Sequence, residues 1–66
     1  MNLTPKQERV LDAMKAEGGT VTEDYLFEFV TRPRIVLNAL EKKGLIRFGD
    51  YWGDEHGYEV HLREGQ

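Results

Sequence analysis

Hydrophobic residues recur at three- and four-residue spacing in three segments of the chain, with polar residues between them. The three sets are Val10, Leu11 and Met14; Leu26, Phe29 and Val30; and Val36, Leu37 and Leu40. This spacing places each set on one face of an α-helix. The pattern therefore predicts helices at about residues 5–17, 23–30 and 33–43.

Residues that favour helix ends flank the first helix. Thr4 is the expected N-cap, and Pro5 stands at the first helical position, where its missing N–H costs nothing. Gln7 falls three residues after Thr4, which completes a capping box. Gly18 and Gly19 are expected to end this helix, because glycine readily adopts the left-handed conformation found there.

The limits of the other two helices rest on similar signals. Thr22 is the candidate N-cap of the second helix. Pro33 disfavours helical backbone at Arg32, so it ends the second helix and opens the third. Gly44 is expected to stop the third helix.

Two further segments have the residue patterns of strands. Val21 lies between two threonines, which predicts a very short strand at residues 20–22. Residues 45–48 are largely apolar, and "YEVHL" at residues 58–62 alternates apolar and polar positions. The glycine-bounded segment "GDEHG" between them predicts a turn, so residues 45–62 are expected to form a β-hairpin.

Size and composition restrict the class of protein. Sixty-six residues are enough for one domain, residues 1–66, and cysteine is absent, which excludes disulfides. No apolar run approaches the roughly 20 residues that span a bilayer, so no membrane association is expected. The first ten residues lack the apolar stretch of a signal peptide. We therefore expect a cytoplasmic protein.

Positive charge is concentrated in one part of an acidic chain. The formal net charge is −3, with nine Lys and Arg residues against twelve Asp and Glu residues. Residues 32–49 nevertheless contain five Lys and Arg residues and only one acidic residue, Glu41. Such segregation matters more than the total charge for binding a charged partner.

The order helix, short strand, helix, tight turn, helix and hairpin resembles the winged helix-turn-helix domains of MarR-like and related bacterial and phage regulators. The segment "LEKKGLIRF", residues 40–48, resembles the end of the third helix and the first wing strand of that family. "GGTVTEDYL", residues 18–26, resembles the exit from its first helix and the start of its second. The resemblance implies an α+β winged helix, with a three-helix core, a short strand and a two-stranded wing.

The resemblance also implies a function. In such domains the third helix enters the major groove of DNA. The residues expected to contact bases are Arg32, Arg34, Ile35 and Asn38, and those expected to contact phosphates are Lys42, Lys43 and Arg47. The expected protein is a sequence-specific regulator of transcription that binds double-stranded DNA, as a homodimer.

The expected wing departs from the family pattern. Its tip contains Asp54 and Glu55, and these carboxylates would repel phosphate. The alternative function is therefore an adaptor or inhibitor that binds another protein and not DNA. Its expected interface consists of the aromatic residues Tyr25, Phe27, Tyr51 and Trp52.

Catalysis and metal binding have little support in the sequence. The chain has no serine, no cysteine and no glycine-rich phosphate loop, so an enzyme is not expected. His56 and His61 are possible metal ligands together with Asp54 and Glu55. Both histidines occupy ordinary positions for solvated side chains, and we expect neither a metal nor another cofactor.

Overall fold

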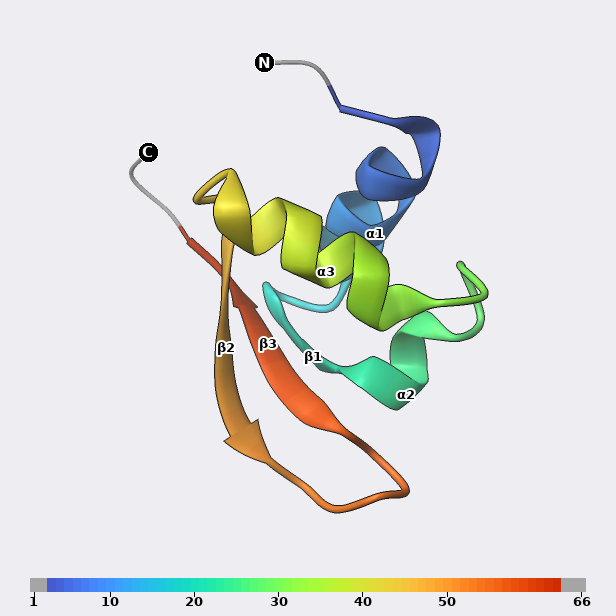
Figure 1. Ribbon diagram of the computed structural model, residues 1–66, viewed down its shortest axis with the longest axis vertical. Helices are drawn as coiled ribbons and strands as arrows, with labels where there is room; N and C mark the ends of the chain where they lie inside the picture. The colour runs from blue at the N-terminus through green and yellow to red at the C-terminus, as the bar shows by residue number, and fades with distance from the viewer. Residues whose placement is uncertain (1–2, 64–66) are drawn as a thin grey trace.

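The computed structural model describes residues 3–63 of the protein, and within that range the chain is a small α+β unit of three helices and three strands (Figure 1). The elements are α1 (Pro5–Ala16), β1 (Thr20–Thr22), α2 (Glu23–Leu26), α3 (Pro33–Lys42), β2 (Ile46–Tyr51) and β3 (Tyr58–Leu62). This order is the one that the sequence predicts. The predicted domain also includes residues 1–2 and 64–66, which lie outside the described part of the chain.

The capping box at the start of α1 is confirmed. The Thr4 hydroxyl accepts a hydrogen bond from the Gln7 amide at 3.2 Å, and the Gln7 side chain accepts one from the Thr4 amide at 3.1 Å. The same Gln7 oxygen accepts a hydrogen bond from Nζ of Lys43 at 2.8 Å. The box therefore also ties the first turn of α1 to the chain just after α3.

The second helix is shorter than the sequence predicts, ending at Leu26 instead of about residue 30. Its hydrogen bonding explains the difference. The amides of Phe27, Glu28 and Phe29 bond to carbonyls three residues earlier, at 3.3, 3.3 and 2.9 Å. Bonds of this kind produce a tight turn and not a continuing α-helix. The turn leads the chain toward Pro33 and leaves Phe27 exposed.

Thr22 is the N-cap residue of α2, but its side chain does not cap the helix. Its hydroxyl donates a hydrogen bond to the Asp24 carboxylate instead. A hydroxyl-to-carboxylate bond is strengthened by the charge of the acceptor, which favours this arrangement. The prediction of a side-chain cap at Thr22 is therefore wrong, although the predicted helix start is right.

Glycines end the two longer helices as predicted. Gly18 follows α1 with a φ of 85°, and Gly44 follows α3 with a φ of 78°. Side chains disfavour this left-handed region, whereas glycine enters it freely. Both helices end within one residue of the predicted limit.

The three strands form one antiparallel sheet in the order β1–β3–β2. Val60 of the central strand is paired with Val21 on one side and with Phe48 on the other. Val21, Ile46 and Val60 are buried in the core with the helices. Because side chains alternate along a strand, Arg47 and its partner His61 lie on the opposite, outer face of the sheet.

An irregularity in β2 changes the direction of its last side chain. Phe48 is paired with Val60, but the next pair is Tyr51 with Tyr58, so β2 has one residue more than β3 between these pairs. Such a β-bulge lets Tyr51 lie on the same face as Phe48 and Tyr58. The Tyr58 ring centroid is 4.9 Å from that of Tyr51 and 5.9 Å from that of Phe48.

The hydrophobic stripes predicted from the sequence form the core. The buried hydrophobic residues are Val10, Leu11, Ala13, Met14, Val21, Leu26, Val30, Leu37, Leu40, Ile46 and Val60. Phe29 and Val36 are half-buried against this cluster. Each large aliphatic side chain contributes about 1.5–3 kcal/mol when it leaves water, so the core holds α1 and α3 against the sheet.

Candidate interaction surfaces around α3

One face of α3 is turned away from the core along its length. A row of exposed residues on this face consists of Arg32, at the N-cap, and Ile35, Asn38 and Lys42 within the helix; Arg34 and Glu41 of the helix are exposed as well. The three- and four-residue spacing of the row places it on one side, opposite buried Leu37 and Leu40. Within residues 3–63, the side chains of Arg32, Asn38 and Lys42 have no hydrogen-bond or ion-pair partner. Their polar groups are therefore open to a ligand.

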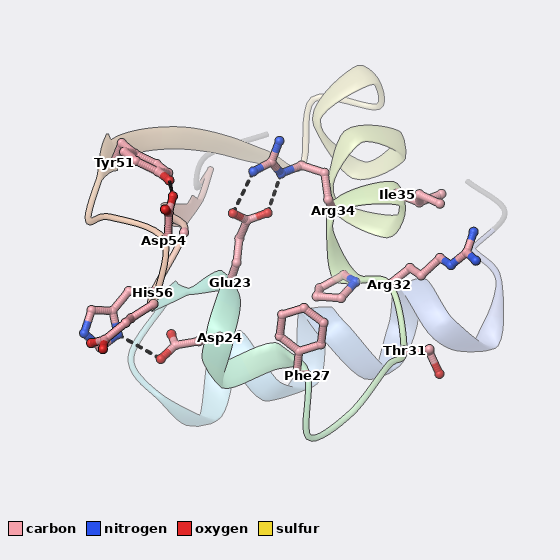
Figure 2. Close-up of a pocket in the computed structure, with 13 residues that line it drawn as sticks. Glu23, Asp24, Phe27, Thr31, Arg32, Arg34, Ile35, Tyr51, Asp54 and His56 are labelled. Carbon is pink, nitrogen blue, oxygen red and sulfur yellow. Dashed lines mark hydrogen bonds and ion pairs between the residues drawn. The ribbon is translucent and has the colours of Figure 1, made fainter.

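Arg34 differs from its neighbours, because the structure gives it a partner within the chain. Its Nε and Nη2 atoms donate to the two carboxylate oxygens of Glu23, with an Nη2–Oε1 distance of 2.9 Å (Figure 2). The guanidinium also lies over the Tyr58 ring, 4.9 Å from its centroid. The Glu23 side chain is 8% exposed and that of Arg34 is 51% exposed. The pair therefore joins a buried carboxylate to a half-exposed cation.

This ion pair shifts the pKa of both partners. The hydrogen bond from Arg34 holds the pKa of Glu23 below its ordinary value, against the opposing effect of burial, and the Tyr58 amide adds to the lowering. The same hydrogen bond raises the pKa of Arg34. The Glu23 carboxylate accepts the Tyr58 amide at 2.8 Å. One ionised side chain therefore connects α2, the first turn of α3 and β3.

The remaining predicted phosphate contacts do not share the outward face of α3. Lys43 is hydrogen-bonded to Gln7 on α1. Arg47 lies on the outer face of the sheet, where it lines a cleft with Lys15 and His61. The five cations of residues 32–49 therefore do not form one surface. Among the described residues, Arg32 and Lys42 are the two of these cations that lie on the exposed side of α3 and have no partner.

The loop between β2 and β3, residues 52–57, is held against α2. The Asp24 amide donates to the His56 carbonyl at 3.1 Å, and the Asp24 carboxylate is 2.9 Å from Nδ1 of His56. Hydrogen bonds from Thr22 and His56 lower the pKa of Asp24, and the bond to Asp24 raises the pKa of His56. Both side chains are charged when His56 is protonated, which strengthens the link between loop and helix.

The four aromatic residues that the sequence marks as a protein interface separate into two groups. Tyr25 is half-buried; its ring packs on Phe29 at 5.3 Å and its hydroxyl donates to Glu17. Burial and this bond raise the pKa of Tyr25. Phe27, Tyr51 and Trp52 are instead exposed. Exposed large aromatic side chains are characteristic of interaction surfaces when they cluster.

Two of these exposed aromatics line a groove of about 460 Å³ between α2, the start of α3 and the β2–β3 loop. Figure 2 shows Tyr51, Asp54 and His56 on the loop side, Phe27 on the helical side, and Glu23 and Asp24 between them. The Tyr51 hydroxyl donates to Asp54, and this bond raises the pKa of Tyr51. The groove therefore combines an apolar lining with carboxylates at its edge.

The two histidines do not belong to a metal site in the described part of the chain, where no group of three potential ligands has suitable geometry. His56 is bonded to Asp24. His61 lies between the Thr20 hydroxyl, 3.0 Å from Nδ1, and the Glu59 carboxylate, 2.8 Å from Nε2. The contact with Thr20 connects β1 to β3, and the contact with Glu59 lies within β3.

Sequence reasoning missed the residues that organise this region, above all Glu23, Asp24 and Tyr58. Acidic residues are favoured in the first turn of any helix by the helix dipole, so Glu23 and Asp24 carry no separate signal of a long-range contact. A signal was present in Arg34. A cation at a helix N-terminus opposes the dipole, which suggests that it has an anionic partner.

No protein-family model, curated protein or solved structure matches the chain. Among residues 3–63, no helix has both the length and the apolar character needed to cross a membrane.

Proposed function

We propose that the protein is a winged helix that binds double-stranded DNA sequence-specifically, as a regulator of transcription, with α3 in the major groove. The observation that carries the proposal is the exposed row on α3. Ile35, Asn38 and Lys42 project away from the core at helical spacing, with Arg32 at the N-terminal end. The N-terminal part of such a helix contacts base edges and its flanks contact phosphates.

The chemistry of the row suits this role. Asn38 has an amide that can bond the adenine edge in two places, and Ile35 can contact a thymine methyl group. Arg32 and Lys42 supply one cation near each end of the helix for bases or phosphates. The four side chains therefore offer hydrogen bonding, apolar contact and charge on one exposed surface.

Arg34 can contact a base in the proposed complex while it stays paired with Glu23. Glu23 occupies the Nε–Nη2 edge of its guanidinium, which leaves the Nη1–Nη2 edge for a guanine. A carboxylate that fixes an arginine reduces the freedom lost on binding. It also cancels the net charge of the arginine, so Arg34 favours base readout over general attraction to phosphate.

The β2–β3 hairpin is the wing of the proposed domain, and it differs from a wing that grips DNA. Its loop is bonded to α2 through Asp24 and His56, and Asp54 and Glu55 stand exposed on it. The proposal therefore places the duplex on α3 without help from the loop. Arg47, on the outer face of the sheet, has no role in this arrangement.

The test is selection of duplexes from a randomised pool by the purified full chain, followed by titration of an enriched duplex in about 50 to 200 mM salt. Two phosphate contacts per domain should weaken binding by about tenfold across this range. An enriched motif with such a salt dependence supports the proposal. Absence of enrichment, with no binding at the lowest salt, overturns it.

Three variants locate the contact on α3. Asn38→Ala should weaken binding to the enriched duplex by about five- to a hundredfold and relax selectivity at one base position. Lys42→Ala should weaken all duplexes alike and reduce the salt slope by about one. Arg47→Ala is the control, since it removes a cation from the opposite face of the sheet. Loss of binding in Arg47→Ala alone contradicts the proposed orientation.

A second candidate function is binding of another protein, favoured by the exposed Phe27, Ile35 and Tyr51 around one groove. In this case Asn38→Ala would leave the interaction intact and Phe27→Ala would weaken it. The predicted homodimer stays a prediction for either function. Sedimentation of the full chain at several concentrations measures it directly.

A further inference from the structure

The groove beside α3 contains much of the exposed apolar surface of residues 3–63. Phe27 is 62% exposed, Ile35 59% and Tyr51 53%, and all three line it. Phe27 lies in the turn that follows α2, Ile35 in α3 and Tyr51 in β2, so the surface exists only in the folded chain. Apolar side chains gathered around one depression, and not scattered singly, mark a site where a partner is bound.

The charges around the groove select the kind of partner. Glu23 and Arg34 neutralise each other in their ion pair. The remaining charged groups of the lining are three carboxylates, those of Asp24, Asp54 and Glu55, against Arg32 and the His56 imidazole that is bonded to Asp24. Excess carboxylate repels phosphate and attracts Lys and Arg side chains. The charges of the groove therefore disfavour binding of nucleic acid and favour binding of a basic polypeptide.

Hydrogen bonds fix the loop side of the groove before any partner arrives. Within the loop, the Trp52 amide donates to the Gly57 carbonyl at 2.9 Å and the Gly57 amide to the Gly53 carbonyl at 2.7 Å. The loop is joined to α2 by the bond from the Asp24 amide to the His56 carbonyl. A wall that is already ordered costs less conformational entropy on binding than a mobile one.

We propose that this groove binds a basic segment of a protein partner, with an apolar side chain seated between Phe27 and Tyr51 and Lys or Arg side chains against Asp24, Asp54 and Glu55. This binding of a basic segment rests on the second candidate function, that of a protein-binding domain. It specifies where on this chain the partner binds and what chemistry the partner has.

A bound segment also interferes with DNA. Arg32 and Ile35 line the groove and at the same time belong to the exposed side of α3 proposed to meet the duplex. A peptide that covers them cannot share the protein with a duplex in the major-groove orientation. Peptide and DNA are therefore mutually exclusive ligands, and the partner acts as an antagonist of DNA binding.

The experiment starts from a displayed library of random 12-residue peptides selected on the immobilised full chain. The enriched sequences should combine Lys or Arg with at least one aromatic or large aliphatic residue. A labelled synthetic copy of one enriched peptide then serves as the probe for fluorescence anisotropy. No enrichment over the bare support, or enrichment of acidic peptides, overturns the proposal.

Matched variants assign the probe to the groove. Phe27→Ala should weaken it by about tenfold or more, as loss of an interface anchor does. Trp52→Ala removes an aromatic side chain of similar exposure that does not line the groove, and it should leave affinity within about twofold. Equal loss in both variants, or loss in Trp52→Ala alone, contradicts the assignment. Circular dichroism and melting of each variant show that the fold is retained.

The charge requirement has its own pair of variants. Glu55→Gln should weaken the probe by about two- to fivefold at low salt, and less at high salt, as expected for a carboxylate at the edge of an interface. Glu8→Gln removes one exposed carboxylate from α1 and should have no effect. If the two variants behave alike, recognition is not electrostatic and the basic partner is wrong.

Two further measurements separate this proposal from its rivals. Sedimentation of wild type and Phe27→Ala tests whether the chain forms a dimer that depends on Phe27. Such a dimer would mean that the groove binds a second copy of the chain, and it would overturn the peptide proposal. If a duplex motif is found, saturating probe should weaken duplex binding by at least about tenfold. Unchanged duplex binding refutes the antagonism, whereas failure of DNA binding itself leaves the Phe27 test of the groove standing.

Discussion

Gly57 lies against Glu23 so closely that a side chain at position 57 has no room. A Cβ atom built on Gly57 would come within 3.0 Å of the Glu23 Cβ and nearer still to a carboxylate oxygen. Residue 57 is in the β2–β3 loop and Glu23 opens α2. This close approach lets the Glu23 carboxylate reach the Tyr58 amide and Arg34 together.

Gly57→Ala is therefore expected to destabilise the fold by more than its backbone conformation alone would cause. Gly57 has a φ of 75°, and a non-glycine residue there costs on the order of 1 kcal/mol. Displacement of Glu23 adds the loss of its hydrogen bonds, about 1–3 kcal/mol. Gly53→Ala is the control, because Gly53 has a φ of 92° and open space beyond it. Urea unfolding should show a clearly larger loss for Gly57→Ala, and equal losses would refute the packing argument.

The coupling between Glu23 and Arg34 is measurable by a double-mutant cycle. Arg34→Ala leaves a buried carboxylate without its cation, and Glu23→Gln removes the charge while keeping an acceptor for the Tyr58 amide. We expect each single variant to lose about 1–3 kcal/mol of unfolding free energy, since Arg34 is half-exposed and the pair is only partly desolvated. The double variant should lose less than the sum of the two. Additive losses would show that the ion pair contributes nothing to stability.

Stability should depend on pH in two separate windows. The pKa values of Glu23 and Asp24 lie below their ordinary values of 4.5 and 3.8, so the stabilisation is present above those values and is lost as pH falls through the folded-state pKa. The pKa of His56 lies above its ordinary value of 6.5, so its stabilisation is present below 6.5 and is lost as pH rises through the folded-state pKa.

These groups together place the stability maximum between about pH 4.5 and 6.5. Melting temperatures measured from pH 3 to pH 9 test this, with His56→Gln as the matched variant. In His56→Gln the decline above pH 6.5 should become shallower, while the acid limb should persist because Glu23 remains paired with Arg34. An unchanged alkaline limb in this variant would mean that the bond to Asp24 does not stabilise the loop.

Gln7 should contribute more to stability than an ordinary capping residue. Thr4→Ala removes one capping hydrogen bond and should cost about 1 kcal/mol. Gln7→Ala removes the reciprocal bond and also the acceptor for Lys43 near the end of α3, so its cost should exceed that of Thr4→Ala. Chemical denaturation of both variants decides the matter. A smaller loss for Gln7→Ala would show that the contact with Lys43 has no energetic weight.

The order and type of the elements could be predicted because their signals are local. The Thr4 capping box and the turn at Gly44 depend on residues within a few positions of each other. The end of α2 has no such local signal. Segments whose amides bond to carbonyls three residues earlier have nearly the same sequence preferences as segments whose amides bond four residues earlier. Phe29 and Val30 are turned inward as the spacing predicts, even though the helix has ended before them.

The spacing of apolar side chains along the chain is enough to specify which elements form and which of their faces become core. The places where charges meet depend instead on how those elements pack. Arg34 is paired with Glu23, eleven residues earlier in the sequence, and His56 with Asp24, thirty-two residues earlier. Contacts between residues so far apart in the sequence produce no periodic pattern from which they could be predicted. Packing likewise placed Arg47 on the far face of the sheet and, through one extra residue in β2, turned Tyr51 toward Tyr58. The Lys and Arg residues that are close together in residues 32–49 therefore lie on different surfaces of the folded chain.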